Sequence, residues 1–293
     1  MRDLTTPPFG PAGADSGGAL LRLAGADALD LLHRLSTQSL SDLPPGGARM
    51  ALFCDFRGRL LHRACVARTA DSVTWLLRDD AGAEELIAFL DRHVFREDVV
   101  LEDASAGHRV RLVPLAQGLP VETVEEVHGV PRRARPDSEF VYEVLEKRED
   151  SSPDPEAERA RIRAGLPRHG HEIAEAFTPF EVGRGHEVHL NKGCFTGQEA
   201  LMRLVTFRSV RRQLVRVSGR GAPPAPPEPI ASAGAGVGVV TSAIGAADGN
   251  AWLGLAVVKR EALAAPLTLA DGRTISVEPI PATRPQGLPD GLG

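Results

Sequence analysis

The sequence contains few cysteines, few aromatic residues and no long apolar run, and each of these shortages excludes a class of protein. Its three cysteines, Cys54, Cys65 and Cys194, are odd in number and widely spaced, which is typical of a reducing compartment and not of a disulfide framework. Aromatic residues make up only 4% of the chain, so nucleic-acid bases would find few rings on which to stack. A transmembrane helix needs roughly 18–20 consecutive apolar residues, and no run of that length occurs.

The charge balance and the first residues exclude further classes of protein. The net charge of −5 argues against general binding to nucleic acids or membrane surfaces, because both carry negative charge. Residues 1–8 lack the apolar segment of a signal peptide. With 293 residues, 42% of them hydrophobic, the chain can form one large domain or two to three small ones. We therefore expect a soluble cytoplasmic protein with neither nucleic-acid nor membrane partners.

The segment Lys192–Glu199 reads K-G-C-F-T-G-Q-E and places one cysteine just before a run with helical spacing. Thr196 and Glu199 have the spacing of a capping box, in which the threonine hydroxyl accepts from a backbone N–H one turn into the helix. Cys194 would then lie just outside the helix N-terminus, where unpaired N–H groups and the helix dipole favour negative charge. Lys192 adds a formal positive charge. We therefore expect a reactive thiolate at Cys194.

The same octet is also compatible with an ordinary strand-to-helix turn. Free cysteines are mostly buried and behave as small hydrophobic residues. A capping box supports a helix start whether or not the cysteine reacts. Local spacing therefore leaves both interpretations open.

Three segments of the chain carry a family resemblance. Every fixed position of K-G-C-[YF]-x-G-Q-E is present in the octet, which resembles the signature of the YgfZ family. Residues 161–167 and 179–181 resemble two further landmarks of that family, R-I-x-x-G-x-P and P-x-E. The match is tight from about residue 161 to 199 and looser at the C-D-x-x-G-R segment, residues 54–59. YgfZ proteins are folate-binding relatives of the glycine-cleavage T-protein and are implicated in assembly or repair of iron–sulfur proteins.

The resemblance implies an α+β, T-protein-like folate-binding fold with a ferredoxin-like layer and a C-terminal β-barrel. The folate-binding module of interleaved α+β subdomains would cover residues 1–207, and the barrel domain residues 208–293. It further implies tetrahydrofolate as cofactor, and folate and iron–sulfur client or assembly proteins as partners. Glu181 matches the position where the T-protein group places a glutamate, and a buried carboxylate can accept N–H bonds from a reduced pterin.

Apolar spacing independently predicts helices and strands for this architecture. One predicted helix lies around residues 29–35 and a second contains Leu86, Phe89, Leu90 and Val94 on one face. The strand–helix–strand order over residues 73–101 suits a ferredoxin-like layer. Asp154 before Pro155 predicts the cap and first turn of another helix, which Gly165 would end.

The last part of the chain shows short strands separated by turns. The turn signals include Asp271–Gly272. This pattern indicates a small β-barrel or sandwich. The Pro- and Gly-rich end after Pro281 is expected to be loose.

Residues 200–220 contain six arginines and no acidic residue. The arginines could simply occupy the outward faces of a helix and a strand. Alternatively, they could bind carboxylates such as the glutamyl tail of a folate. Both interpretations stay open, and Arg211 and Arg212 are the better binding candidates because they follow the octet most closely.

Two rival chemistries for Cys194 find little support in the sequence. His186, His189 and Cys194 are all possible zinc ligands, but neither histidine belongs to the family motif and no second cluster supplies a fourth ligand. We therefore expect no metal site. A cysteine hydrolase or acyltransferase would need a general base, which a nearby histidine could provide, yet no local signature of such enzymes surrounds the thiol.

The remaining rival is a folate-dependent aminomethyl- or methyltransferase. T-proteins carry a D-F-x-G type segment where this chain has residues 192–197, and their catalytic aspartate has no clear counterpart here. The acidic pair Asp79–Asp80 could be proposed as catalytic, but we interpret it as part of a solvated strand–helix junction. These departures favour an assembly factor with a reactive Cys194 and Lys192 as its charge partner.

Overall fold

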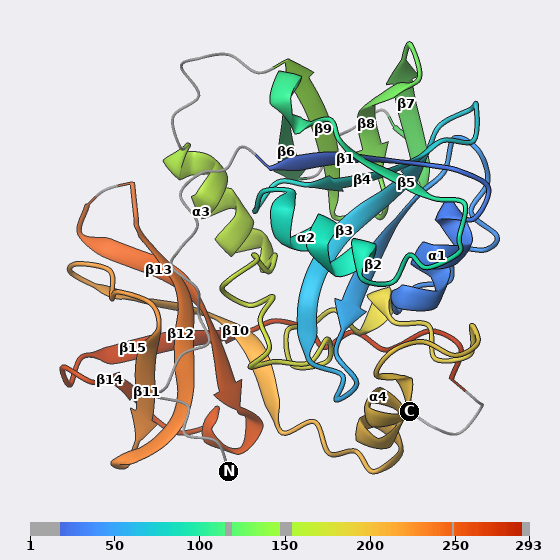
Figure 1. Ribbon diagram of the computed structural model, residues 1–293. Coiled ribbons are helices and arrows are strands. Elements are labelled where there is room, and N and C mark those ends of the chain that lie inside the picture. Colours follow the sequence, from blue (N-terminus) through green and yellow to red (C-terminus); the bar gives the residue numbers. More distant parts are fainter. Residues whose placement is uncertain (1–17, 115–118, 147–153, 248, 289–293) are drawn as a thin grey trace.

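The computed structural model describes residues 18–114, 119–146, 154–247 and 249–288 (Figure 1). Its first layer is a five-stranded antiparallel sheet of order β2-β3-β4-β1-β5. The elements of this part are β1 (Ala19–Ala24), α1 (Ala28–Leu35), β2 (Ala48–Cys54), β3 (Leu60–Arg68), β4 (Thr74–Arg78), α2 (Glu84–Asp91) and β5 (Val100–Asp103).

Both helices of this part lie on one face of the sheet and share one apolar cluster with it. The predicted helix around residues 29–35 is confirmed as α1, whose Leu31, Leu32 and Leu35 are buried. The second predicted helix is α2, which buries Leu86, Phe89 and Leu90 but ends at Asp91, before the predicted Val94. None of the helices in the described ranges is long and apolar enough to cross a bilayer.

A second sheet of four strands, in the order β6-β9-β8-β7, covers the opposite face of the first sheet. It contains β6 (His108–Pro114), β7 (Thr123–Val127), β8 (Val130–Arg135) and β9 (Phe140–Glu146), preceded by a short 3-10 turn at Ser105–Gly107. Trp75 and Leu77 of the first sheet pack in one cluster with Phe140 and Tyr142 of the second. The N-terminal module is therefore layered as helices, sheet and sheet.

The helix predicted after Asp154 is confirmed as α3 (Pro155–Ala164). The Asp154 side chain accepts from the backbone N–H of Glu156 at 2.9 Å, and Pro155 occupies the first turn. Gly165 ends the helix in the left-handed conformation with φ of 71°. These three features were predictable because a helix cap is formed by residues adjacent in the chain.

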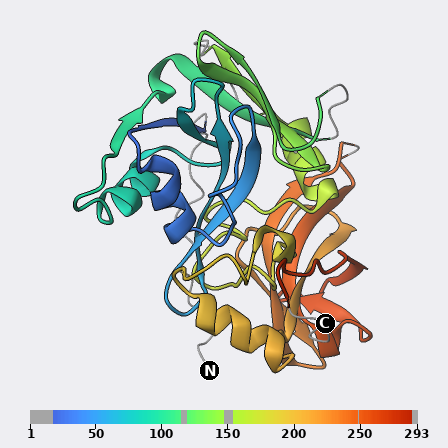
Figure 2. The same ribbon diagram turned by 90° about the vertical axis from the view of Figure 1, so that its right-hand side faces the viewer.

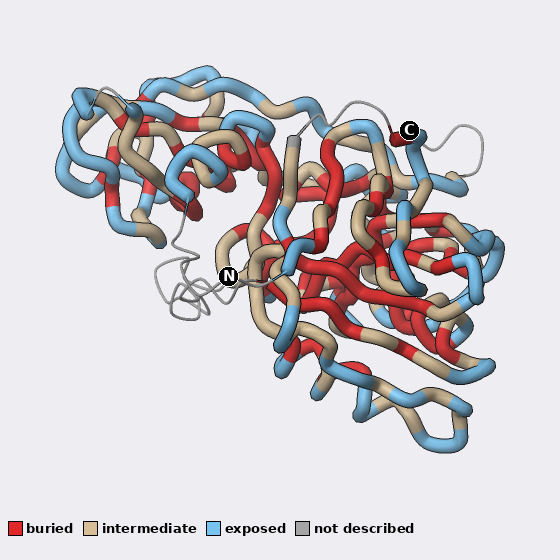
Figure 3. The backbone as a smooth tube through the Cα atoms, turned by 90° about the horizontal axis from the view of Figure 1, so that it is seen from above, coloured by how far each residue is buried: buried red, intermediate tan, exposed pale blue. Residues whose placement is uncertain are grey.

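Between α3 and α4 (Gln198–Thr206), the chain forms turns and one short 3-10 helix at Gly185–Glu187. The segment is nevertheless buried. Phe177, Val188 and Phe195 pack there in one cluster with Leu60 of β3 and Leu214 of the C-terminal domain. This joining segment therefore binds the N-terminal module to the C-terminal domain, and buried backbone runs through the region between them (Figure 3).

The C-terminal domain is a closed barrel, which decides between the barrel and the sandwich that the sequence left open. Its strand order is β10-β13-β12-β11-β14-β15. The strands are β10 (Arg212–Arg220), β11 (Glu228–Ser232), β12 (Ala235–Gly245), β13 (Ala251–Lys259), β14 (Leu267–Leu269) and β15 (Thr274–Pro279), with a 3-10 turn at Arg260–Ala262. Closure pairs both edges of the sheet.

The expectation of a loose end after Pro281 is wrong for residues 281–288. After β15 the chain returns to the joining segment, where Gln286 donates its backbone N–H to the Val188 carbonyl at 2.8 Å and accepts from Leu190 at 2.9 Å. The Thr283 hydroxyl donates to the Gly183 carbonyl at 2.8 Å. The joining segment has few regular backbone partners, and the returning chain satisfies some of its polar groups.

Candidate functional site

The octet lies at the start of α4, at the end of the molecule away from the second sheet (Figures 1 and 2). The predicted capping box is wrong. Gly197 occupies the N-cap position with φ of 86°, and no side chain caps the helix. Because the helix starts one residue later than predicted, Thr196 and Glu199 no longer have capping positions. Glu199 instead pairs with Arg203 at 2.6 Å.

Gly197 begins the helix because it touches another turn of the protein. A Cβ at this position would lie 2.5 Å from the Asp55 carbonyl oxygen and 3.1 Å from the Gly58 Cα. The turn Asp55–Gly58 joins β2 to β3, and the Asp55 carboxylate accepts the backbone N–H groups of Arg57 and Arg59 at 2.8 Å each. The octet is therefore docked on the turn formed by the C-D-x-x-G-R segment.

Cys194 is exposed, whereas Cys54 and Cys65 are buried. Burial raises the pKa of the Cys54 and Cys65 thiols far above the ordinary value. All three cysteines of the chain are described, so Cys194 is the thiol that solvent and large partners can reach in the folded protein. This exposure removes the interpretation of Cys194 as a packed core residue.

Lys192 connects the octet to α1. Its ammonium group donates to the His33 carbonyl and lies 5.0 Å from the centre of the Phe195 ring. Burial lowers the pKa of Lys192 to about 8. The His33 ring returns a hydrogen bond from Nε2 to the Lys192 carbonyl at 3.1 Å, while its Nδ1 accepts from the Leu40 N–H at 3.0 Å. Burial and the Lys192 charge lower the pKa of His33, in agreement with this neutral tautomer.

Glu181 is buried and already engaged. One carboxylate oxygen accepts from Arg212 Nε at 2.7 Å, and the other accepts from the backbone N–H and hydroxyl of Thr178 at 3.0 and 3.1 Å. Arg59 Nη1 lies 3.5 Å from the second oxygen. A carboxylate offers about four lone-pair positions, so roughly one acceptor position of Glu181 is left for a ligand.

The structure separates the two arginines that the sequence grouped as binding candidates. Arg212 bonds to Glu181, donates to the Ala176 carbonyl at 2.9 Å and lies 5.3 Å from the centre of the Phe177 ring. Arg211, one residue earlier, is exposed. From the sequence, Glu181 and Arg212 were both expected to bind one folate. In the structure the two side chains bind each other.

Carboxylates from outside residues 200–220 neutralise part of the positive charge of this arginine-rich segment. Arg216, on β10, pairs with Glu278 of β15 at 2.5 Å. Such partners lie far away in the chain, so a count of acidic residues within 200–220 could not find them. Arg59 was likewise missed as a neighbour of Glu181, although the looser C-D-x-x-G-R match contains it.

A pocket of about 310 Å³ opens beside the octet. It is lined by Leu190, Asn191, Met202, Gly287 and Leu288. Asn191 directly precedes the octet and Met202 lies on α4, while the remaining wall includes the returning C-terminal segment. The volume lies at the lower end of the range for small-molecule sites. Cys194 does not belong to this lining.

The interpretation of Asp79–Asp80 as a solvated junction is wrong. The Asp80 side chain is only 12% exposed and lies 3.4 Å from Arg78, and it accepts the backbone N–H of His169 at 2.7 Å. Burial opposes ionisation of Asp80, yet Arg78 and His169 together lower its pKa. Burial and the neighbouring Asp80 charge raise the pKa of Asp79 to about 7.

The metal alternative considered for the octet does not assemble in this structure. Among the described residues, two groups bring three possible ligand atoms within 4.8 Å of one another: His62, Glu85 and His169, and Asp137, Glu139 and His186. His186 therefore lies beside acidic residues of the N-terminal module, and Cys194 belongs to neither group.

Comparisons with known proteins agree with this architecture. Residues 211–286 match the family of CAF17 C-terminal β-barrel domains. The crystal structure of the glycine cleavage system aminomethyltransferase T from Bartonella henselae superimposes with a TM-score of 0.67 over 93% of this chain and 86% of that one, at 16% identity. The chain therefore has the T-protein fold, as expected from the sequence.

Similar sequences include transferases. A candidate chloroplastic transferase of Arabidopsis thaliana is 34% identical over 119 residues, which cover 41% of this chain and 27% of that relative. An aminomethyltransferase of Symbiobacterium thermophilum is 27% identical over 266 residues, which cover 74% of this chain and 70% of that protein. The match thus spans about a quarter of the first relative's length and more than two thirds of the second's.

Proposed function

We propose that this protein binds tetrahydrofolate and, like the YgfZ proteins whose octet it resembles, assists the assembly or repair of iron–sulfur enzymes. The observation that carries the proposal is the exposed thiol of Cys194 within that octet, on a T-protein fold. Thiolates are the usual protein ligands of iron–sulfur clusters. The similarity to aminomethyltransferases supports the folate part of the proposal. The match of residues 211–286 to CAF17 C-terminal β-barrel domains agrees with the C-terminal barrel that the YgfZ resemblance implies.

Exposed aromatic residues on the two elements next to the octet suit a protein partner. Phe56, at the turn on which the octet is docked, and Phe207, at the end of α4, are each 73% exposed. Aromatic residues are enriched in the buried centres of protein interfaces. Cys194 could serve such a partner by ligating a cluster transiently, by forming a mixed disulfide or by reacting with a one-carbon unit.

Glu181, Arg211 and Arg212 are the residues that fit a folate. Glu181 keeps one acceptor position for a pterin N–H. Arg212 and the exposed Arg211 are the cations proposed for the glutamyl carboxylates. A reduced folate would supply the one-carbon chemistry of the site.

The client or assembly proteins would be met in a compartment that keeps cysteines reduced, for which the cytoplasm stays our expectation. All three cysteines are free, as is typical of such compartments. The proposal needs neither nucleic acid nor a membrane as partner.

The alternative is a folate-dependent aminomethyl- or methyltransferase. Alignment over 74% of this chain with the Symbiobacterium aminomethyltransferase favours it. The purified protein would then release or transfer the one-carbon unit of a methylene or methyl donor with many turnovers. Binding of the same donor without turnover would favour the assembly factor.

Calorimetry with tetrahydrofolate tests the proposed site. We expect Glu181→Gln to weaken binding by roughly tenfold or more, because a hydrogen bond to a charged group contributes about 1.5–3 kcal/mol. Cys194→Ala should bind as the wild type does. Glu278→Gln, which removes a carboxylate from another arginine pair on the barrel, is the matched control and should also bind normally.

Two results would contradict this assignment. Failure of the wild-type protein to bind tetrahydrofolate would remove the folate part of the proposal. Unchanged affinity in Glu181→Gln would remove Glu181 from the site while leaving the proposed role of Cys194 standing.

A further inference from the structure

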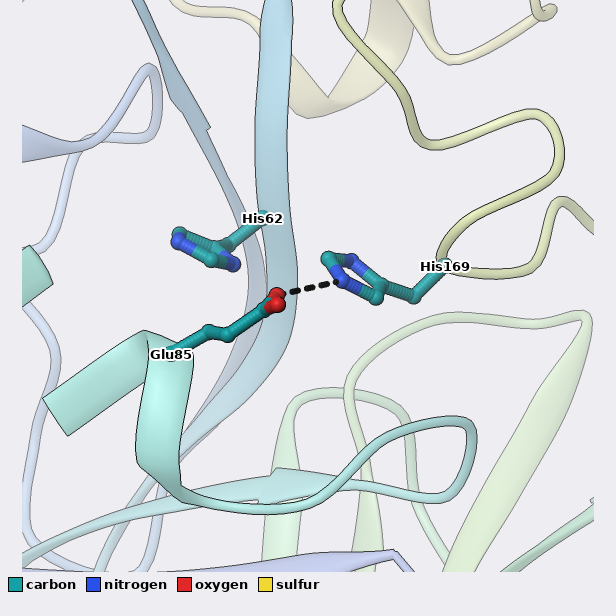
Figure 4. A group of neighbouring side chains, drawn as sticks. All are labelled: His62, Glu85 and His169. Carbon is teal, nitrogen blue, oxygen red and sulfur yellow. Dashed lines mark hydrogen bonds and ion pairs between the residues drawn. The ribbon is translucent and has the colours of Figure 1, made fainter. Parts of the chain in front are cut away.

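Two histidines and a glutamate converge on the face of the first sheet that α2 covers. His62 lies on β3, Glu85 lies in the first turn of α2, and His169 lies in the turns that follow α3. Figure 4 shows the three side chains pointing toward one another, with the Glu85 carboxylate between the two rings. His169 and Glu85 are 84 positions apart in the chain, so the group could not be predicted from the spacing of residues in the sequence.

The distances within this group are close to those of a metal site. One possible ligand atom of each residue lies within 4.8 Å of the others, and His169 Nε2 lies 3.1 Å from Glu85 Oε2. Bonds of about 2.0–2.2 Å in a tetrahedral zinc site place neighbouring ligand atoms roughly 3.3 Å apart. His169 and Glu85 already have that spacing, and the His62 nitrogen needs to move by at most about 1.5 Å.

Unsatisfied nitrogen atoms provide a second, independent indication. Nδ1 of His62 and Nδ1 of His169 are both buried and have no hydrogen-bond partner. Most buried polar side-chain atoms in native proteins have a partner, and each exception calls for an explanation such as a bound ion. A metal ion bonded to Nδ1 of His62 would give that ring the partner it lacks, whereas His169 would bind the ion through Nε2, the nitrogen that already contacts Glu85.

The charged neighbours of the group have both signs. Burial, followed by the charge of Arg78, lowers the pKa of both His62 and His169. Asp80 lies 3.4 Å from Arg78 and offsets that guanidinium charge, which would otherwise repel a cation. The Glu85 carboxylate then remains to balance the charge of a bound ion.

The group is partly rigid and partly adjustable. The His62 ring packs against Phe89 with centroids 5.3 Å apart, and it stacks on His169 at 5.5 Å with an angle of 12° between the planes. Parallel rings cannot both aim an in-plane lone pair at one ion, so one ring must turn. A turning His169 ring could keep its contact with Glu85, because the Glu85 side chain is 75% exposed and can follow it.

The second group of possible ligands is already partly used by the protein itself, although Asp137 Oδ2 and His186 Nδ1 are also buried without a partner. Glu139 pairs with Arg184 at 2.5 Å, and the Asp137 carboxylate accepts the backbone N–H of Glu139 at 2.7 Å. A cation there would have to displace these contacts. The contact between Glu85 and His169 is the kind that a metal ion converts directly into two bonds.

We propose that His62, Glu85 and His169 bind zinc or a similar divalent transition-metal ion. Three protein ligands leave a fourth position for water or a donor atom of another molecule, which is the arrangement of catalytic and not of structural zinc sites. This site is independent of the folate and thiol chemistry proposed above, and it departs from the sequence-based expectation that the chain has no metal site.

Titration of the chelator-treated full chain with Co²⁺ and Zn²⁺ tests the proposal. We expect one equivalent of cobalt to bind with the visible absorption of a four-coordinate ion, and zinc to displace it. Glu85→Gln and His169→Gln should each weaken binding at least tenfold, because each removes one of three protein ligands. His93→Gln is the matched control, since His93 contacts the Phe89 carbonyl at 2.8 Å but lies outside the group.

The outcome also discriminates between the two groups. Unchanged cobalt affinity in both Glu85→Gln and His169→Gln, or loss of binding only in His186→Gln, would overturn the proposal. Absence of stoichiometric binding by the wild-type chain would do the same. Glu85 is exposed, so the thermal unfolding midpoint of Glu85→Gln without metal should match that of the wild type and rule out misfolding.

Discussion

At the scale of single residues, burial distinguishes the three thiols. Cys54 and Cys65 lie inside apolar clusters, while Cys194 is exposed. Because the thiolate is the reactive form, alkylation of the native protein should modify Cys194 alone, which makes its reactivity measurable without removing the other two.

We expect Lys192→Met to slow alkylation of Cys194 by roughly twofold to fivefold below pH 8, because a nearby charge in water-like surroundings contributes up to about 1 kcal/mol. Above pH 8 the difference should fade, since the Lys192 pKa of about 8 means that its ammonium loses the charge there. The measurement is the iodoacetamide rate across pH, read by mass spectrometry.

Lys259→Met provides the control for this experiment. Lys259 lies on β13 and donates to the Gly236 carbonyl, so its removal should leave the Cys194 rate unchanged. Identical pH profiles for wild type and Lys192→Met would show that Lys192 holds α1 to the octet without influencing the thiol.

At the scale of elements, the start of α4 depends on a contact that the helix cannot make by itself. The octet has two glycines with positive φ, of 106° at Gly193 and 86° at Gly197. A Cβ at Gly193 would have no neighbour within 4 Å, whereas one at Gly197 would collide with the Asp55 carbonyl. Alanine substitutions at the two positions therefore separate the cost of backbone strain from the cost of losing the contact with the Asp55–Gly58 turn.

We predict that Gly193→Ala and Gly197→Ala both destabilise the protein, each by about 1–3 kcal/mol of backbone strain. Gly197→Ala should cost more, because the new methyl group also pushes the octet away from the Asp55–Gly58 turn. Equilibrium unfolding in denaturant measures the loss. Equal losses for the two variants would mean that docking on the turn contributes nothing to stability.

At the scale of the whole molecule, a buried polar network joins α3 to the barrel. Glu172 is fully buried and accepts from the Thr241 and Ser242 hydroxyls, the latter at 2.8 Å. It also lies 3.4 Å from Arg161, the arginine of the R-I-x-x-G-x-P landmark. Arg161 donates to Ser242 at 2.8 Å. Arg161 of the landmark therefore helps to hold the domains together.

We expect Glu172→Gln to lower the free energy of unfolding by about 3 kcal/mol, since it removes the buried carboxylate shared by Arg161, Thr241 and Ser242 and leaves Arg161 with only the partly exposed Glu158 as a counter-charge. Hydrogen exchange should rise in β12, which carries Thr241 and Ser242. Glu158→Gln is the control, because Glu158 pairs with Arg161 at 2.7 Å and is partly exposed. A loss as large in Glu158→Gln would contradict the proposed bridge.

The sequence was informative wherever neighbours in the chain decide the outcome. The cap of α3 at Asp154, its end at Gly165 and the buried faces of α1 and α2 followed from local spacing. The fold itself followed from a resemblance carried by three short motifs, because similar sequences keep similar folds even where their sites differ.

Tertiary structure decided what each polar side chain contacts. Several contacts join residues that are far apart in the chain, and they form only when the sheets, the joining segment and the barrel pack. They are Glu181 with Arg212, Lys192 with His33, and His62 with His169. The start of α4 was mispredicted by one residue for the same reason, since the Asp55 carbonyl selects Gly197. Short-range preferences are properties of the residues themselves, whereas a hydrogen bond between distant residues exists only after apolar burial has fixed where both backbones lie.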